Sequence, residues 1–193
     1  MMTELAAYED GQPVNPPGSP QIHAESFDPY AYPLEPRWFK RPESIHGLSH
    51  TRRVLIHCCA IAASVGLDPD EFESLALAVA WHDIGRTHDG RDPEHGAKSV
   101  VRAKELGLSE GVDPRILARV LFAVELHSIN DETVLERPTP ASDSESKFRV
   151  LWVLKDADGL DRVRIYDLDS RRLRYPISRD RVDKAWELLD QLP

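Results

Sequence analysis

The adjacent residues His82 and Asp83 are the first candidates for chemistry, because they follow an apolar run within Ala80-Trp81-His82-Asp83-Ile84-Gly85. If the pair is buried, both groups need polar partners, since an unpaired buried carboxylate is costly. A divalent metal ion would be such a partner, and imidazole together with carboxylate suits zinc, iron or manganese. A His-Asp pair alone is more often a solvated helix end. The interpretation therefore depends on what other ligands the sequence provides.

Two further segments carry residues of the metal-binding type. His50 lies in the segment His46-Gly-Leu-Ser-His50-Thr-Arg-Arg53-Val54, and Asp156 lies in Lys155-Asp156-Ala-Asp158-Gly-Leu-Asp161. Both segments are predicted to be helical, and facing helices of a bundle can direct such side chains into a metal site in the core. The chain thus offers His, then His-Asp, then Asp, in that order.

With these three motifs the sequence resembles the HD-domain metal-dependent phosphohydrolase superfamily, over about residues 44–165. The resemblance rests on the His-x-x-Arg-Val start, the His-Asp-Ile-Gly centre and the Lys-Asp-Ala-Asp-x-Leu-Asp end. It implies that the first metal is held by His50, His82, Asp83 and Asp156, with Asp83 and His82 as the catalytic residues. Asp156 is preferred over its neighbours by motif register only, and Asp158 and Asp161 could instead orient metal-bound groups.

Two more histidines, His95 and His127, lie between the centre and the end of the motif set. Some branches of the superfamily place two histidines in this interval and hold a second metal, bridged to the first by the central aspartate. The resemblance then implies that His95, His127 and a bridging Asp83 form a second site. Alternatively, His95 only begins a helix and His127 only ends one, where a protonated histidine is mildly favourable. We favour two ions, and the expected cofactor is one or two divalent ions of Fe, Mn, Zn or Mg.

The expected reaction is hydrolysis of a phosphate ester or anhydride in a nucleotide or another small phosphorylated metabolite. A metal ion lowers the pKa of bound water toward 7 and neutralises charge on a phosphoryl oxygen. Plausible contacts to the substrate are Arg53, Arg86, Lys98 and His46. Each cation could equally be a solvated helix-face charge, and His46 could replace His50 as a ligand if both lie on one helix face.

Two other functions remain open at this point. A few members of the superfamily hold two irons on the same six positions and activate oxygen, and a third interpretation is a non-catalytic module that senses a nucleotide. Other hydrolase and nucleotide-binding signatures are absent, because the sequence has no Gly-x-Ser-x-Gly elbow and no Gly-x-x-x-x-Gly-Lys loop.

The elements that must position these residues are predicted to be helices, which makes the fold class all-α, a compact HD-domain bundle of about five to seven helices. Start signals include the capping box Asp68-Pro69-Asp70-Glu71, and Gly66 is a stop signal. We see no confident alternating strand. The expected helices span about residues 49–65, 68–83, 92–107, 113–127, 148–163 and 178–192, with a polar loop at 130–145.

Composition suggests two regions in the 193-residue chain. Residues 1–36 are rich in proline and are interpreted as a tail. Beyond residue 25 the segment could instead be a strap, in which Phe27 to Tyr32 packs across the helical domain. Residues 37–193 form the expected helical domain. The net charge of -9 and the lack of a basic stripe argue against a nucleic acid polymer as partner.

Neither a signal peptide nor a transmembrane segment is apparent, so we expect a cytoplasmic protein without membrane contact. The expected partner is a small phosphorylated substrate, and the oligomeric state is left open. Cys58 and Cys59 are the only cysteines and are expected to be buried, reduced thiols.

Overall fold

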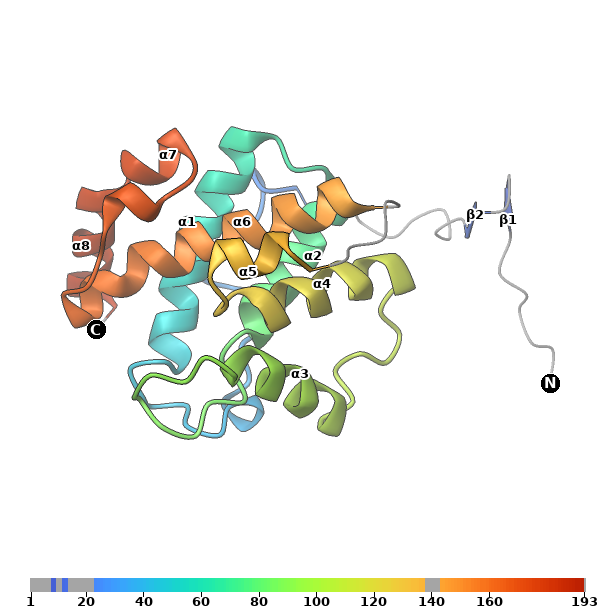
Figure 1. Ribbon diagram of the computed structural model, residues 1–193, viewed down its shortest axis with the longest axis horizontal. Helices are drawn as coiled ribbons and strands as arrows, with labels where there is room; N and C mark the ends of the chain where they lie inside the picture. The colour runs from blue at the N-terminus through green and yellow to red at the C-terminus, as the bar shows by residue number, and fades with distance from the viewer. Residues whose placement is uncertain (1–7, 10–11, 14–22, 138–142, 193) are drawn as a thin grey trace.

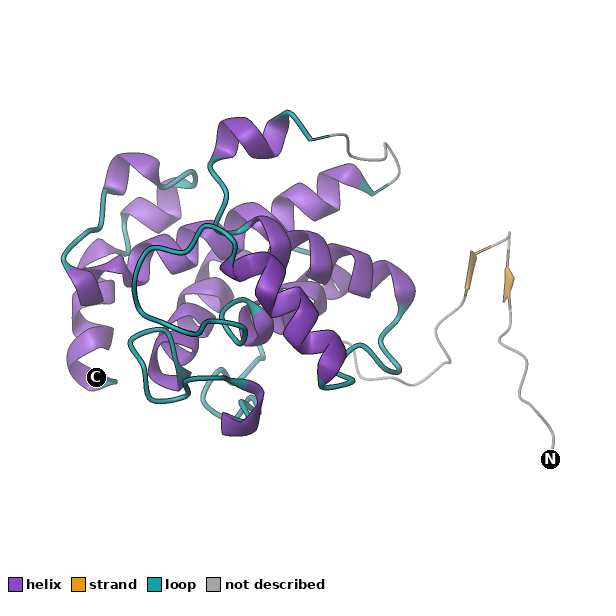
Figure 2. Cartoon of the chain, turned by 60° about the horizontal axis from the view of Figure 1, so that its bottom comes forward, coloured by secondary structure: helices purple, strands orange, loops and turns teal. Residues whose placement is uncertain are grey.

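The computed structural model describes residues 8–9, 12–13, 23–137 and 143–192, and most of them are helical (Figures 1 and 2). The predicted all-α fold is confirmed. A small antiparallel hairpin near the N-terminus pairs β1 (Tyr8–Glu9) with β2 (Gln12–Pro13). The α-helices are α1 (Leu48–Val65), α2 (Pro69–Trp81), α3 (His95–Glu105), α4 (Pro114–Leu126), α5 (Asp131–Leu135), α6 (Ser144–Leu160), α7 (Pro176–Arg179) and α8 (Val182–Gln191). Three 3-10 turns are η1 (Pro36–Trp38), η2 (Asp161–Ile165) and η3 (Ser170–Arg172).

Local sequence signals explain where α2 and α4 begin and where α1 ends. The predicted capping box is present, since the Asp68 side chain accepts from the Glu71 amide at 2.8 Å and Glu71 accepts from the Asp68 amide at 3.0 Å. Asp113 caps α4 by accepting from the Arg115 amide at 2.8 Å. Gly66 ends α1 with a left-handed φ of 65°, a conformation that glycine adopts without strain.

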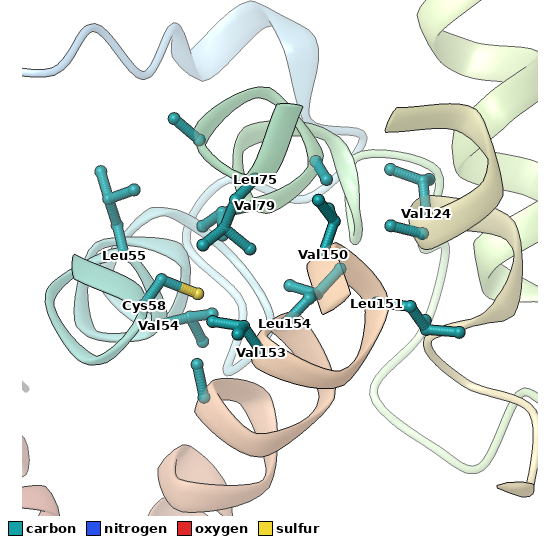
Figure 3. Close-up of a cluster of buried hydrophobic side chains, with 14 of the residues drawn as sticks. Val54, Leu55, Cys58, Leu75, Val79, Val124, Val150, Leu151, Val153 and Leu154 are labelled. Atoms are coloured by element: carbon teal, nitrogen blue, oxygen red, sulfur yellow. The ribbon is translucent and has the colours of Figure 1, made fainter. Parts of the chain in front are cut away.

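Helix α6 lies at the middle of the bundle and packs against α1, α2 and α4 (Figures 1 and 3). Most of its buried side chains are aliphatic, and close packing of this kind fixes the relative positions of the helix ends. Cys58 belongs to this core, and burial raises the pKa of its thiol well above the ordinary value, as expected for an unreactive thiol. Core residues labelled in Figure 3 are Val54, Leu55, Cys58, Leu75, Val79, Val124, Val150, Leu151, Val153 and Leu154.

The structure differs from the predicted helices in two places. Part of the predicted loop at 130–145 forms α5, because Asn130 caps it by accepting from the Thr133 amide at 2.8 Å. Residues 138–142 of that loop lie outside the described part of the chain. The predicted helix at 178–192 is two helices, since a short α7 begins at Pro176 and ends before Asp180.

Part of the proline-rich segment packs on the helices. The Phe27 ring lies 5.1 Å from the Phe72 ring and 5.3 Å from the Tyr32 ring, measured between centroids. Arg52 donates hydrogen bonds to the carbonyl oxygen atoms of Pro29 and Tyr32. These contacts tie residues 27–32 to α1 and α2.

Within the described residues, none of the helices combines the length and the apolar character that crossing a bilayer requires.

A buried histidine of α1 makes stability depend on pH. His57 is fully buried, its Nδ1 accepts from Nε of Arg181 at 3.3 Å, and burial lowers its pKa to about 3. The unfolded chain, with a histidine pKa near 6.5, therefore takes up a proton first as the pH falls. Stability linked to His57 is present above pH 6.5 and is lost progressively toward pH 3.

We expect that His57→Gln, which cannot take up this proton, loses less stability in acid than the unaltered protein. Between pH 7.5 and 5.0 the difference should be about 2 kcal/mol in the free energy of unfolding. Urea titrations in EDTA at both pH values measure it, and His23→Gln, at an exposed histidine, is the control. Equal pH dependence of unfolding in the unaltered protein and His57→Gln would contradict this account of His57.

Candidate metal centre

Four histidines and one aspartate, located at or near the ends of α1, α2, α3 and α4, converge in the interior of the protein. Nε2 of His50 lies 3.0 Å from Nε2 of His82, and Nε2 of His95 lies 2.7 Å from Nε2 of His127. The Asp83 carboxylate lies between the two pairs. Its Oδ2 atom is 3.5 and 3.6 Å from Nε2 of His50 and His82, and its Oδ1 atom is 3.2 and 3.8 Å from Nε2 of His95 and His127. All five side chains are buried.

Helix ends place these five side chains. His50 is in the first turn of α1, His82 follows α2, Asp83 lies in the next turn, His95 begins α3 and His127 follows α4. Two glycines let the backbones approach. A Cβ at Gly96 would lie 2.4 Å from the Val124 carbonyl oxygen, and one at Gly85 would lie 2.5 Å from the backbone of Lys98. Gly85 is the last residue of the predicted His-Asp-Ile-Gly centre, and Gly96 directly follows the predicted ligand His95.

Each of the four histidines is held through its Nδ1 atom by an oxygen that can only accept. The partners are the Val79 carbonyl for His82 at 2.7 Å, the Val124 carbonyl for His127 at 2.7 Å, the Asp92 carbonyl for His95, and the Asp161 carboxylate for His50 at 2.6 Å. When a ring is neutral, its Nδ1 therefore carries the proton and its Nε2 keeps the lone pair. This is the arrangement that outer hydrogen bonds give to metal-ligating histidines.

The protonation of the cluster fits a divalent metal. Burial lowers the pKa of His82 to about 3 and that of His95 to about 4, so both rings are neutral at pH 7. Burial and Arg164 lower the pKa of His50, but its hydrogen bonds with Asp161 and Asp83 outweigh them, and the pKa of His50 is raised. The pKa of Asp83 lies well below its ordinary value, because the surrounding histidines outweigh the opposing effect of burial. Neutral imidazole nitrogens around a buried carboxylate are a donor set that divalent metals bind.

The aspartate from α6 beside this cluster is Asp158, which corrects the prediction of Asp156. Oδ1 of Asp158 lies 3.4 Å from Nε2 of His50. The Asp156 carboxylate instead accepts from the amides of Arg174 and Tyr175 at 2.8 and 2.9 Å and from Nη1 of Arg174 at 2.8 Å. Two residues apart on a helix, the side chains point to nearly opposite faces. Asp161, three residues after Asp158, shares its face and reaches His50.

Two of the four predicted substrate contacts lie at the cluster. Nδ1 of His46 is 3.2 Å from Oδ2 of Asp83, and it accepts from Nη2 of Arg164 at 3.0 Å. His46, His50 and Asp83 thus form a group that could itself hold a metal ion. Nε of Arg86 donates to Oδ1 of Asp83 at 3.1 Å. Sequence reasoning missed Arg164, whose position follows from the η2 turn after α6.

The other two predicted contacts have different roles, which is a second correction. Arg53 is 3% exposed and donates to both oxygens of Asp161, at 2.6 and 3.0 Å, and to the Leu192 carbonyl. Each of its three guanidinium nitrogens donates to one of these groups. Lys98 is exposed on α3 and donates to the Asp92 carboxylate at 2.8 Å.

Comparisons with known proteins agree with this geometry. Residues 47–163 match the family described as HD domain, a range that includes the five converging residues and Asp158. A protein of Bacillus subtilis (strain 168), named "Putative phosphohydrolase YueE", is 24% identical over 178 residues, which cover 86% of this chain and 92% of that protein. No solved structure gives a significant match.

Proposed function

The chain belongs to the HD-domain family, and on that basis we propose that it is a metal-dependent phosphohydrolase with two divalent ions. The observation that carries the proposal is the set of four imidazoles with fixed tautomers around both oxygens of Asp83. The similarity to a protein named as a phosphohydrolase supports the same reaction class. The proposed substrate is a nucleotide or another small phosphorylated metabolite.

The proposed ligands divide into two halves that share Asp83. We call His50, His82, Asp158 and Oδ2 of Asp83 the His50 half, and His95, His127 and Oδ1 of Asp83 the His95 half. The acceptor oxygens behind the rings keep all four Nε2 atoms directed at the centre, which reduces the cost of organising the site.

Divalent ions held there would act as Lewis acids, lower the pKa of a bound water toward 7 and stabilise charge on a phosphoryl group. The chain's own residues would orient the substrate. Arg86 contacts Asp83 on one side, and Arg164 stands next to His46 on the other. Two guanidinium groups beside the proposed ions make the local field attractive to a phosphate despite the net charge of -9.

The proposal is tested with protein stripped by EDTA and reloaded with Mn²⁺, Zn²⁺ or Fe²⁺. We expect release of phosphate or nitrophenol from nitrophenyl phosphate esters and from a panel of nucleotides and sugar phosphates, only with metal. His57→Gln, which alters a buried histidine outside the centre, should keep this activity. Absence of hydrolysis with every metal and substrate, or dioxygen consumption by iron-loaded protein without phosphate release, would contradict the proposal.

A further inference from the structure

One of the four histidines differs from the others in what holds its Nδ1 atom. His82, His95 and His127 donate to neutral backbone carbonyls, whereas His50 donates to a carboxylate, Oδ2 of Asp161, at 2.6 Å. Asp161 has no exposed surface. The bond therefore joins two fully buried groups, and it is the only one of the four that carries a charge.

We propose that Asp161 is a positioning residue that strengthens metal binding in the His50 half, so that the two halves bind divalent metal with unequal affinity. The inference rests on the two-metal centre of the proposed function. A carboxylate behind an imidazole fixes the ring and makes its free nitrogen a stronger ligand. The His50 half also has a second carboxylate, Asp158, 3.4 Å from Nε2 of His50.

The His95 half has the opposite balance of charge. Its shared oxygen, Oδ1 of Asp83, already accepts from Nε of Arg86 at 3.1 Å. A guanidinium at that distance repels a cation and competes for the lone pairs of the oxygen. Among the described ion pairs, the carboxylate that His95 and His127 share is Asp83, whereas His50 also has Asp158 and Asp161. The ion in the His95 half is therefore the weaker one.

Asp161 is itself held in place from two directions. Nε and Nη2 of Arg53 donate to its two carboxylate oxygens at 2.6 and 3.0 Å, and Nη1 of Arg164 lies 3.3 Å from Oδ2. Arg53 also donates to the Leu192 carbonyl, directly after α8. The carbonyl after α8 thus helps to hold Arg53, and Arg53 in turn holds the Asp161 carboxylate. That carboxylate orients the His50 ring. This gives Arg53 a positioning role in place of the predicted substrate contact.

Asp156, on α6 and five residues before Asp161, is a matched control. Like Asp161 it has no exposed surface, and its carboxylate is held by an arginine, Nη1 of Arg174 at 2.8 Å. Its other bonds are to backbone amides, and it contacts none of the four histidines. Asp156→Asn and Asp161→Asn therefore remove a similar buried charge, but only the second alters a partner of His50.

The experiment measures cobalt(II) affinity of metal-stripped protein by titration of its visible absorption. His127→Ala isolates the His50 half, and His50→Ala isolates the His95 half. In the His127→Ala background we expect Asp161→Asn to weaken cobalt binding about 10- to 100-fold. In the His50→Ala background it should have no effect, and Asp156→Asn should have no effect in either. The unaltered protein should bind cobalt in two separable steps.

Three outcomes would each overturn the inference and leave the hydrolase proposal standing. The first is two equal binding steps in the unaltered protein, the second is unchanged cobalt affinity in Asp161→Asn, and the third is the same weakening of cobalt binding in Asp156→Asn. Complete absence of cobalt binding would overturn both. If Asp161→Asn fails to fold, Arg53→Lys serves instead, because it keeps the positive charge but loses the bidentate contact with Asp161. It should weaken binding in the His50 half alone, and unchanged affinity would overturn the inference.

Discussion

Asp83→Ala should lose both metal ions and, with them, hydrolytic activity. Asp83 is the residue that contacts all four converging histidines, so its removal leaves neither half with a complete ligand set. Outer contacts of metal ligands change affinity about 10- to 100-fold, so loss of a shared inner ligand should weaken binding by more than about 100-fold. Metal analysis of the purified variant measures this directly.

The Asp83→Ala protein should remain helical, because Asp83 lies in the turn after α2 and is not one of the hydrophobic core residues. Circular dichroism provides that control. His82→Ala is the companion variant, expected to lose the ion of the His50 half and to retain the other. Metal content of Asp83→Ala equal to that of the unaltered protein would remove Asp83 from the centre.

The second large effect separates Asp158 from Asp156. Asp158→Ala should lose the metal of the His50 half and reduce kcat/KM by about 100-fold or more, as expected for an inner ligand. Asp156→Ala should keep its metal but unfold more easily, by about 1–3 kcal/mol, because two backbone amides and Arg174 lose their acceptor.

Metal analysis and urea unfolding of both variants, side by side, measure the two effects. The reverse outcome, in which Asp156→Ala loses metal and Asp158→Ala does not, would restore the assignment made from motif register. Loss of metal in both would mean that the position of α6 as a whole, and not one carboxylate, determines binding.

The main helices could be predicted because their signals are local. The capping box at Asp68 and Glu71, the cap at Asp113 and the stop at Gly66 act within a few residues of the helix end they determine. Helix α5 was missed because Asn130 caps only five residues inside a polar stretch with two prolines. The break between α7 and α8 was missed because apolar periodicity continues across it.

The histidines could be predicted because their order along the chain matches a known motif, whereas their partners could not. Asp156 and Asp158 are equivalent in composition, and only the helical face, which follows from packing of α6 against α1, decides between them. Arg53 lies 108 residues from Asp161 in the sequence. No local sequence pattern predicts such a contact, so Arg53 could equally be interpreted as a substrate contact from the sequence.

The central claim is that two metal ions lie on either side of Asp83, and anomalous diffraction from crystals of protein purified without added metal tests it most directly. We expect two peaks, one among His50, His82 and Asp158 and one beside His95 and His127, with the Asp83 carboxylate between them. A single peak with His95 and His127 turned away from it, or no peak at Asp83, would contradict the account.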